Sequence, residues 1–445
     1  MARQRRSADV APPIESAEPA ALLAALDADA EAIGLARAAR PSAARYRTAG
    51  RRSSRAAGVP LDLVAIDGLL SWRSPADRAV VRGASAARRP AAPAPAAGRV
   101  LATRVFEAVA PDAVHAAVQR LDASFSPGRG LLQLVKRRLV AAPPGPHVGR
   151  SLVVVHGTFS NADHFLADLQ ATPHGRDLLG RAAAHYDRVL FFDHATLARG
   201  PLLNAVELDR ALAGSTHAVD LICHSRGGLV ARWWLETLGT GRRGPCRAVL
   251  VGAPIAGTSL AAGPRLRAGI DAMTTLGSVI AASGQVLGLA APFLAAPVGL
   301  LRILLSIGGV ANRLPIADAA LACVPGLFAQ SRIGNNSELG ILRAARAPRA
   351  LDYFTVASTF EPADEGWRFW RYFRRTTAAG LAAEVVFDGP NDLVVDTASM
   401  DDFGAASGVR PTAALQFGAG DAIHHCGYFR DPRTTAFIAD ALRIP

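Results

Sequence analysis

Six short apolar runs in the last two thirds of the chain limit its fold more than any other feature. They are SLVVVHG (151–157), RVLFFDH (188–194), AVDLICH (218–224), CRAVLVGAP (246–254), DYFTVAST (352–359) and AEVVF (383–387). Apolar runs without polar alternation are typical of strands that are buried on both faces, as in a parallel sheet. Helical segments such as HFLADLQA, NAVELDRALAG and GGLVARWWLETLG separate several of them. The pattern therefore predicts an α/β fold with a mostly parallel central sheet flanked by helices.

Positive charge is concentrated in the N-terminal third of the chain. Residues 1–150 carry 23 Lys and Arg against 12 Asp and Glu (+11), whereas residues 151–445 carry 26 against 25 (+1). The formal net charge of +12 is therefore no evidence that the whole chain binds nucleic acid. No aromatic residues are interleaved with the N-terminal arginines, so we expect a solvated tail and no nucleic-acid partner. Contact of this basic arm with acidic lipid or nucleic acid is the alternative.

Composition also divides the chain near residue 98. The first part is rich in Ala, Arg, Pro and Ser, with a linker-like stretch, GASAARRPAAPAPAAG, at 83–98 and one possible helix at 21–39. We therefore expect residues 1–98 to form a basic, partly disordered extension that is dispensable for chemistry. Residues 99–445 are then expected to form one α/β domain.

One stretch interrupts the alternation of strands and helices. Residues 272–301 contain no charged residue, and the apolar character continues to residue 311 after Arg302. The stretch is rich in Ala, Gly, Ser and Thr, and Pro292 and Pro297 interrupt it. We expect a helical lid at about 260–330, packed over the rim of the sheet. An element that contacts lipid at the membrane surface and a true membrane span are the alternatives.

The strongest chemical signal is DLICHSRGGLVARWW (220–234), in which an apolar strand, a tight turn and an amphipathic helix follow one another. A nucleophile elbow places a Ser on a sharp strand-to-helix turn, and small residues two positions before and after the Ser allow that turn. Here Ser225 is flanked by Cys223 and Gly227, with His224 directly before it. Cys223 departs from the usual Gly but is still small. The alternative is a Ser that caps an ordinary helix.

A second signal, SLVVVHGTFSNADHF (151–165), precedes the first in the chain. In folds with a nucleophile elbow, the loop after an upstream strand that ends in His-Gly can place one donor to an oxyanion. The two backbone N–H groups that fit this role belong to Thr158 and to Arg226, and Gly157 allows close approach of the backbone. His156 is expected to make hydrogen bonds in the turn rather than to act as the base, because it precedes the nucleophile.

An acid and a base are expected after the nucleophile, in the order Ser, acid, His. The segment FDGPNDLVVDTASM (387–400) offers Asp388, Asp392 and Asp396, and the G-x-x-D-x-V-V pattern favours Asp392. The segment DAIHHCGYFRD (421–431) offers two histidines. We expect His425 to be the base and keep His424 as the alternative.

These motifs resemble those of the lipase-like α/β-hydrolases, especially the branch near the GPI inositol-deacylases and PHB depolymerases. The resemblance rests on VVVHGTFSN, CHSRGG, VGAPIAGTSLA, GPNDLVV and HHCGYF and covers about residues 148–440. Two further segments, at 189–212 and 324–339, look like an uncharacterised bacterial branch of these proteins. The resemblance implies an α/β-hydrolase fold, a Ser-Asp-His triad and no metal. It implies no particular substrate, because this fold hosts many chemistries.

The expected function is therefore hydrolysis of a carboxylic ester with an apolar acyl group, from a small molecule or a lipid, through an acyl-enzyme. Acyl transfer or amide hydrolysis by the same residues is a second possibility. A non-catalytic interaction module that keeps the hydrolase sheet is a third. The lid is expected to allow peripheral contact with a membrane.

Cysteine usage and the start of the chain bear on cofactors and location. The four cysteines, Cys223, Cys246, Cys323 and Cys426, are far apart and include no C-x-x-C pair, so neither a zinc site nor a disulfide framework is expected. We expect no cofactor. The first twenty residues contain Pro, Glu and Asp where a secretory signal has its apolar segment, which favours a reduced, cytoplasmic location.

Overall fold

The structure is a computed structural model of the 445-residue chain. It describes residues 20–36, 58–66, 69–73, 99–146, 148–215, 217–239, 246–262, 265–282, 292–306, 323–332, 336–344, 346, 351–361, 387 and 389–445.

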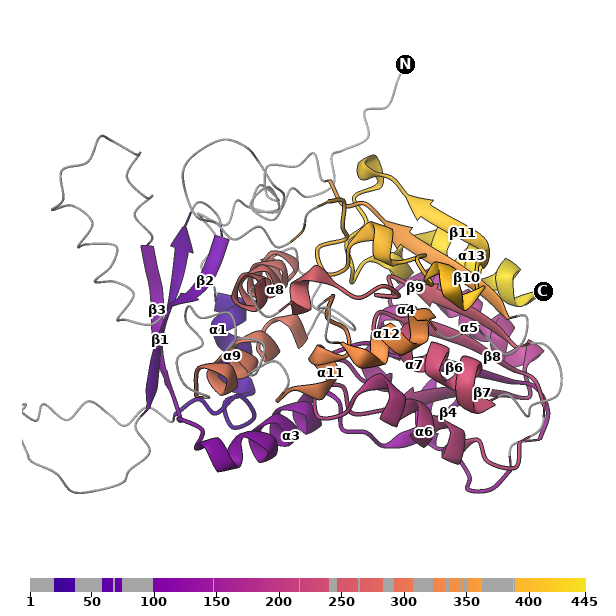
Figure 1. Ribbon diagram of the computed structural model, residues 1–445, viewed down its shortest axis with the longest axis horizontal. Coiled ribbons are helices and arrows are strands. Elements are labelled where there is room, and N and C mark those ends of the chain that lie inside the picture. Colours follow the sequence, from indigo (N-terminus) through magenta and orange to yellow (C-terminus); the bar gives the residue numbers. More distant parts are fainter. Residues whose placement is uncertain are drawn as a thin grey trace, which may run out of the picture.

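The larger of two sheets has eight strands in the order β11-β10-β9-β8-β6-β7-β4-β5 (Figure 1). Strands β6 to β11 are mutually parallel, whereas β4 is antiparallel to both β5 and β7. Strands β6, β8 and β9 are buried along their whole length. The predicted mostly parallel sheet is confirmed. Its strands are β4 (Gly130–Val135), β5 (Arg138–Ala141), β6 (Ser151–Val155), β7 (Arg188–Asp193), β8 (Val219–His224), β9 (Arg247–Val251), β10 (Asp352–Ser358) and β11 (Pro411–Phe417).

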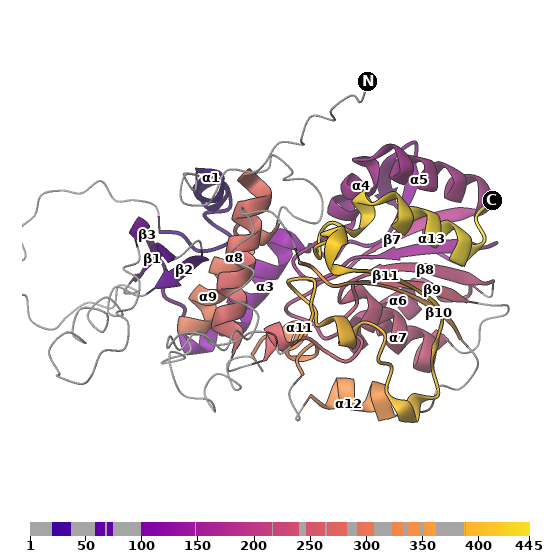
Figure 2. The ribbon, with the colours of Figure 1, turned by 90° about the horizontal axis from the view of Figure 1, so that it is seen from above.

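Helices cover both faces of this sheet, as Figure 2 shows. On one face lie α4 (Ala162–Gln170), α5 (Pro173–His185) and α13 (Pro432–Leu442), and on the other lie α6 (Pro201–Ala211) and α7 (Gly227–Trp233). Polar side chains fix where several of them begin, because they accept hydrogen bonds from backbone N–H groups of the first turn. Asn161 caps α4, Thr172 caps α5 and Asp431 caps α13.

The stretch between β9 and β10 is helical. It contains α8 (Leu266–Ala282), α9 (Ala296–Ser306), α11 (Pro325–Phe328) and α12 (Ser337–Ala344). Helix α8 lies between the two sheets of the molecule (Figure 2). In the part of the chain that the structure describes, no helix has the length and apolarity that a membrane crossing requires.

A second, three-stranded sheet is built from the segment that composition had marked as an extension. It consists of β1 (Val59–Ile66), β2 (Leu69–Arg73) and β3 (Arg99–Phe106) in the antiparallel order β2-β1-β3. Helix α1 (Ala20–Ala28) packs against α8, and helix α3 (Val114–Phe125) packs against α9.

The prediction that residues 1–98 form an extension separate from the following domain needs correction. Strand β1 pairs with β3 across the predicted boundary. Leu61, Leu63 and Trp72 are fully buried in the same apolar cluster as residues of the larger sheet. The segment looked separable because alternating polar residues, such as the buried Asp62, hide its strands from a search for continuous apolar runs.

Other differences from the sequence prediction are local. Of the predicted helix at 21–39, the described residues are helical only in α1, after which the chain turns at Gly34 with φ +65°, and residues 37–39 lie outside the described part. Strands β5 and β11 were not predicted because they are edge strands, largely exposed, and carry no apolar run. Of the predicted AEVVF strand, residues 383–386 lie outside the described residues.

Candidate active site

A strained turn between β8 and α7 carries Ser225. The backbone of Ser225 has φ +54°, a left-handed conformation that is rare for residues other than Gly. Its N–H donates to the carbonyl of Val251 at 2.9 Å, which ties the turn to the end of β9. Backbone strain of this kind persists where the surroundings enforce it and is concentrated at functional sites. The turn therefore has the shape that a nucleophile elbow needs.

Small residues around Ser225 make room for this turn. A Cβ atom on Gly227 would lie 2.5 Å from the carbonyl oxygen of Val155. A Cβ atom on Gly157 would lie 2.7 Å from Cβ of Ser225. Cys223 is completely buried within β8, where its small side chain packs in the apolar core, and burial raises the pKa of its thiol.

Asp392 and His425 form a buried acid–imidazole pair. His425 Nδ1 lies 2.7 Å from Asp392 Oδ2, and the backbone N–H of His425 donates to the carbonyl of Asp392 at 2.9 Å. The other carboxylate oxygen accepts from the N–H groups of Val394 at 3.0 Å and Val395 at 2.7 Å. A carboxylate that accepts from Nδ1–H leaves the imidazole Nε2 as the atom able to take up a proton.

Two residues that the sequence prediction missed complete this pair. The hydroxyl of Tyr428 donates to Asp392 Oδ2 at 2.9 Å, and burial together with the neighbouring carboxylate raises the pKa of Tyr428. Gly252, with φ +56°, passes so close that a Cβ atom there would lie 2.7 Å from the Tyr428 ring and 3.3 Å from His425 Nδ1. A Gly after a buried strand and a Tyr three residues after the His pair were the available signals.

The two other histidines near Ser225 have different surroundings. His224 Nε2 lies 3.0 Å from the carbonyl oxygen of His425, and the two rings are 4.7 Å apart. Burial lowers the pKa of His224 well below its ordinary value, so the ring is neutral and donates through Nε2–H. His424 packs against Phe360, and burial lowers its pKa to about 4. His425 is thus the histidine of the adjacent pair that contacts Asp392.

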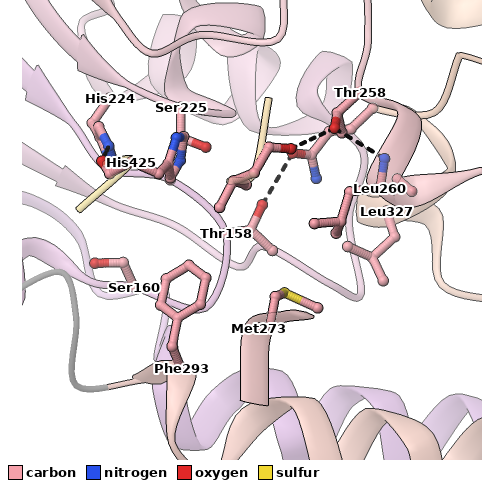
Figure 3. Close-up of a pocket in the computed structure, with 14 residues that line it drawn as sticks. Thr158, Ser160, His224, Ser225, Thr258, Leu260, Met273, Phe293, Leu327 and His425 are labelled. Atoms are coloured by element: carbon pink, nitrogen blue, oxygen red, sulfur yellow. Dashed lines mark hydrogen bonds between the residues drawn. The ribbon is translucent and has the colours of Figure 1, made fainter. Parts of the chain in front are cut away.

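The loop after β6 holds Thr158 beside Ser225. His156 is buried, with Nδ1 2.9 Å from the carbonyl oxygen of Gly157, while Nε2 accepts from the N–H of His194 at 3.1 Å. The hydroxyl of Thr158 donates to Gln330 Oε1 at 3.2 Å (Figure 3). The loop is thus held on one side by His156 and on the other by the hydrogen bond from Thr158 to Gln330.

The side chain of Arg226 holds the turn at Ser225 in place through buried hydrogen bonds. Its guanidinium is completely buried, and Nη2 donates to the carbonyl of Arg199 at 2.5 Å and to Asn204 Oδ1 at 2.7 Å. Burial lowers the pKa of Arg226 to about 10, so the group is still charged at neutral pH. The backbone N–H of Arg226 lies at the start of α7, where amide N–H groups have no partner within the helix.

A cavity of about 40 Å³ opens at Ser225 and His425. Figure 3 shows Thr158 on one side of it and Met273 and Phe293 on another. Its walls are mainly apolar, and the apolar side chains that line it are Leu260, Ala261, Met273, Phe293, Leu327 and Val394. A small apolar cavity beside a serine and an acid–imidazole pair is suited to hold the acyl part of an ester.

A comparison with models of known protein families shows which family the chain belongs to. Residues 119–443 match the model described as Domain of unknown function (DUF7379). The chain belongs to this family. The DUF7379 domain begins within α3 and contains the eight-stranded sheet and every residue of the candidate site. Strands β1 to β3 lie outside it.

Known proteins of similar sequence or structure add the following. No curated protein matches the chain in sequence. Solved structures with a similar fold include lipase 1 from Pelosinus fermentans (13% identity, 66% of this chain, 98% of that chain, TM-score 0.41). Lipase BlEst2 from Bacillus licheniformis gives 15% identity, 68% and 95% coverage and a TM-score of 0.37. Esterase RhEst1 from Rhodococcus sp. ECU1013 gives 17% identity, 68% coverage of this chain, 92% coverage of that chain and a TM-score of 0.34.

The DUF7379 domain of this chain has an α/β-hydrolase fold. Its own architecture carries this assignment: the mostly parallel sheet, the strained Ser225 turn between β8 and α7, and the chain order of Ser225, Asp392 and His425. Among the residues that the structure describes, no group of three or more His, Cys, Asp or Glu side chains has the arrangement of a metal site.

Proposed function

We propose that this protein is a serine hydrolase that cleaves carboxylic esters with an apolar acyl group. The observation that carries the proposal is the 2.7 Å contact between Asp392 and His425 at the cavity into which the strained Ser225 turn opens. The three residue types are those of a nucleophile, a general base and an orienting acid.

In the proposed reaction, Ser225 Oγ attacks the acyl carbonyl while its proton passes to Nε2 of His425. The N–H groups of Thr158 and Arg226 stabilise the negative oxygen of the tetrahedral intermediate. Protonated His425 then donates to the leaving alkoxide, which departs as the alcohol and leaves an acyl-enzyme. Water attacks this ester, its proton passes to His425, and release of the acid regenerates Ser225. Asp392, held by Tyr428, stabilises the imidazolium in both halves of the reaction.

The acyl group is assigned to the apolar cavity. Met273 of α8 and Phe293 line it, and both belong to the stretch at about 260–330 that is predicted to be a lid. We propose that α8, together with the segment around Phe293, forms part of this lid. An apolar acyl chain gains from contact with their side chains, because burying apolar surface contributes about 25 cal/mol per Å².

A fluorophosphonate probe and a panel of p-nitrophenyl esters from acetate to palmitate test the proposal. We expect the probe to label Ser225 and the purified protein to hydrolyse part of the panel. The Ser225→Ala variant should not be labelled, and its rate of hydrolysis should be lower than that of the parent by on the order of 10³-fold or more. Unchanged hydrolysis by a folded Ser225→Ala protein would contradict the mechanism, and absence of labelling in the parent would favour a non-catalytic module. Faster turnover with an added amine or alcohol acceptor would indicate acyl transfer.

A further inference from the structure

The carboxylate of Asp122, near the end of α3, accepts four hydrogen bonds from the loop that follows β7. Asp122 is only 2% exposed. Its Oδ1 accepts from the N–H of Thr196 at 2.8 Å and from the hydroxyl of the same residue at 3.0 Å. Its Oδ2 accepts from the N–H groups of Leu197 at 2.9 Å and Ala198 at 2.7 Å. Hydrogen bonds to a buried carboxylate are among the stronger ones, so they fix this loop against α3.

The same loop supports the segment that carries Thr158. The N–H of Phe159 donates to Thr196 Oγ1 at 3.2 Å. Ser126, directly after α3, donates through its hydroxyl to the carbonyl of Ser160 at 2.6 Å, and its Oγ lies 2.9 Å from Thr196 Oγ1. The two residues after Thr158 are therefore held by side chains that belong to, or are bonded to, the end of α3.

The peptide that contains the Thr158 N–H is held on both sides. After it, Phe159 has φ +57°, a left-handed conformation that persists in a residue other than Gly only where the surroundings enforce it. Before it, His156 Nδ1 lies 2.9 Å from the carbonyl oxygen of Gly157. Because the C=O and N–H of a trans peptide point in opposite directions, the N–H of Thr158 points away from the His156 ring. Thr158 and Ser225 line the same cavity (Figure 3).

The loop after β7 also supports the second expected donor to the oxyanion, the N–H of Arg226. The guanidinium of Arg226 donates to the carbonyl of Arg199, directly after the residues that Asp122 binds. Burial lowers the pKa of Arg226 to about 10, and the charge of Asp122 opposes this shift. Asp122 and Arg226 are thus two buried charges joined through one short loop.

We propose that Asp122 and Thr196 are positioning residues that aim the N–H groups of Thr158 and Arg226 at the oxyanion. The proposal rests on the ester hydrolysis proposed above. Neither Asp122 nor Thr196 lines the cavity, so both act through the backbone that they hold. A donor stabilises the oxyanion only when its N–H lies about 3 Å from the developing charge, so a small displacement of the loop lowers the rate.

Three variants of the full-length protein change this support. Thr196→Val keeps the shape of the side chain but removes the hydroxyl that Phe159 and Asp122 contact. Thr196→Ser restores that hydroxyl and is the rescue variant. Asp122→Asn places an amide nitrogen, which is a donor, opposite backbone N–H groups. Thermal unfolding verifies that each variant is folded.

Two controls match these variants in burial and chemistry. Thr355→Val changes a completely buried threonine of β10 whose hydroxyl has no hydrogen-bond partner among the described residues. Asp220→Asn changes a carboxylate that is 3% exposed and accepts from the N–H of Arg247 at 2.9 Å. Asp220 lies at the end of β8 opposite Ser225 and does not line the cavity.

The first readout is steady-state kinetics on p-nitrophenyl butyrate. Thr196→Val should lower kcat about tenfold, less than the loss of a whole donor, because the Thr158 N–H is displaced and not removed. Asp122→Asn should lower kcat by on the order of 10²-fold, because it disturbs both donors. KM should change by no more than about twofold, since the oxyanion exists only after Ser225 attacks. Thr196→Ser and both controls should keep the kcat of the parent.

The second readout is the inhibition constant of an alkyl trifluoromethyl ketone. Ser225 Oγ adds to its carbonyl carbon, the proton of Ser225 passes to His425, and the carbonyl oxygen becomes an oxyanion that resembles the transition state. The inhibition constant should rise in Thr196→Val and Asp122→Asn by the factor by which kcat/KM falls. A variant that is merely less stable contains less active protein but binds the ketone with unchanged affinity.

The third readout is amide hydrogen exchange at Phe159, which requires no enzymatic activity. Exchange should be faster in Thr196→Val and Asp122→Asn than in the parent and unchanged in the two controls. Unchanged exchange in Thr196→Val would overturn the support of this segment, even if Asp122→Asn does not fold.

The remaining outcomes separate the positioning role from the proposed function. Faster exchange at Phe159 with unchanged kcat and an unchanged inhibition constant would overturn the positioning role, and so would an equal loss of kcat in Thr196→Ser and Thr196→Val. If the parent is not labelled at Ser225 and hydrolyses no ester, the proposed function fails and the positioning role fails with it. The exchange data then still decide whether Asp122 and Thr196 hold the segment after β6.

Discussion

The eight-stranded sheet and the N-terminal sheet with α8 are held in place by different kinds of contact. Strands β6, β8 and β9 are buried on both faces, and the candidate site forms at their carboxyl ends from turns fixed by backbone geometry. The contact between β2 and α8 combines apolar packing with buried hydrogen bonds to Asp271 and Thr275. The first arrangement depends on residues that are close in the sequence, whereas the second joins residues about 200 positions apart.

This difference separates two properties of the protein, its proposed chemistry and its stability. The positions of Ser225 and His425 are set within the DUF7379 domain, so the chemistry should survive changes in the N-terminal sheet. Variants in the two regions should therefore change different quantities, namely the turnover rate in one case and the stability in the other.

The largest effect on stability is expected from removing residues 1–98. This deletes α1, β1 and β2 and exposes the partners of Leu61, Leu63 and Trp72. Full burial of each such side chain contributes about 1.5–3 kcal/mol, so the loss should be about 5 kcal/mol or more. Calorimetry of a chain that starts at residue 99 should give a clearly lower Tm. An unchanged Tm would mean that the segment is separable, as its composition had predicted.

The next largest effect separates the two adjacent histidines. His425→Ala removes the proposed base and should lower kcat by on the order of 10³-fold. His424→Ala is the matched variant and should change kcat by only a few fold, because His424 lies against Phe360, whereas His425 makes the 2.7 Å contact with Asp392. Steady-state kinetics on one short ester measures both. The reverse ranking would assign the base to His424 and leave the rest of the mechanism intact.

Acid should destabilise the site region through His424. Burial, followed by the charge of Arg430, lowers the pKa of His424 to about 4, with Asp392 opposing and His425 adding to the shift. Between about pH 6.5 and pH 4 the unfolded chain binds a proton here that the folded chain does not, so stability falls as the pH drops. The contribution is at most about 3 kcal/mol.

Urea unfolding at about pH 7 and about pH 4.5 measures this contribution, and His424→Phe should flatten the dependence. Asp168→Asn is the opposing control. Burial raises the pKa of Asp168 to about 6, so protonation of this carboxyl stabilises the folded protein as the pH drops through the same window. The Asp168→Asn variant should therefore lose stability more steeply than the parent as the pH falls. Parallel curves for the parent and His424→Phe would contradict the assignment.

A smaller effect is expected at Tyr428. Tyr428→Phe removes the hydroxyl that donates to Asp392 and should lower kcat about tenfold with little change in KM, because the loss affects the orientation of His425 and not substrate binding. Tyr186→Phe is the matched control, since the Tyr186 hydroxyl donates to Asp220, a buried carboxylate that does not line the cavity. Equal effects of the two variants on kcat would indicate a loss of stability rather than of positioning.

Features that depend on neighbouring residues were predictable from the amino-acid sequence. The buried strands are continuous apolar runs, and the elbow requires small residues two positions on either side of Ser225, so both leave a local pattern. The G-x-x-D-x-V-V pattern likewise predicted which carboxylate meets an imidazole, whereas the adjacent His424 and His425 left two alternatives for that imidazole. Their chemical roles stay predictions that the ester panel tests.

Features that depend on distant residues were decided by the tertiary structure. A side chain at position 252 would be too close to Tyr428 and His425, which lie far away in the sequence, so Gly252 has to be a glycine. Ser71 and Asp62 look like surface residues in the sequence, yet both are buried, because Asp271 and Thr103 supply their hydrogen-bond partners. A polar side chain is stable inside a protein only when a partner reaches it. Since that partner can lie 200 residues away, its identity follows from how the chain packs and not from the local pattern.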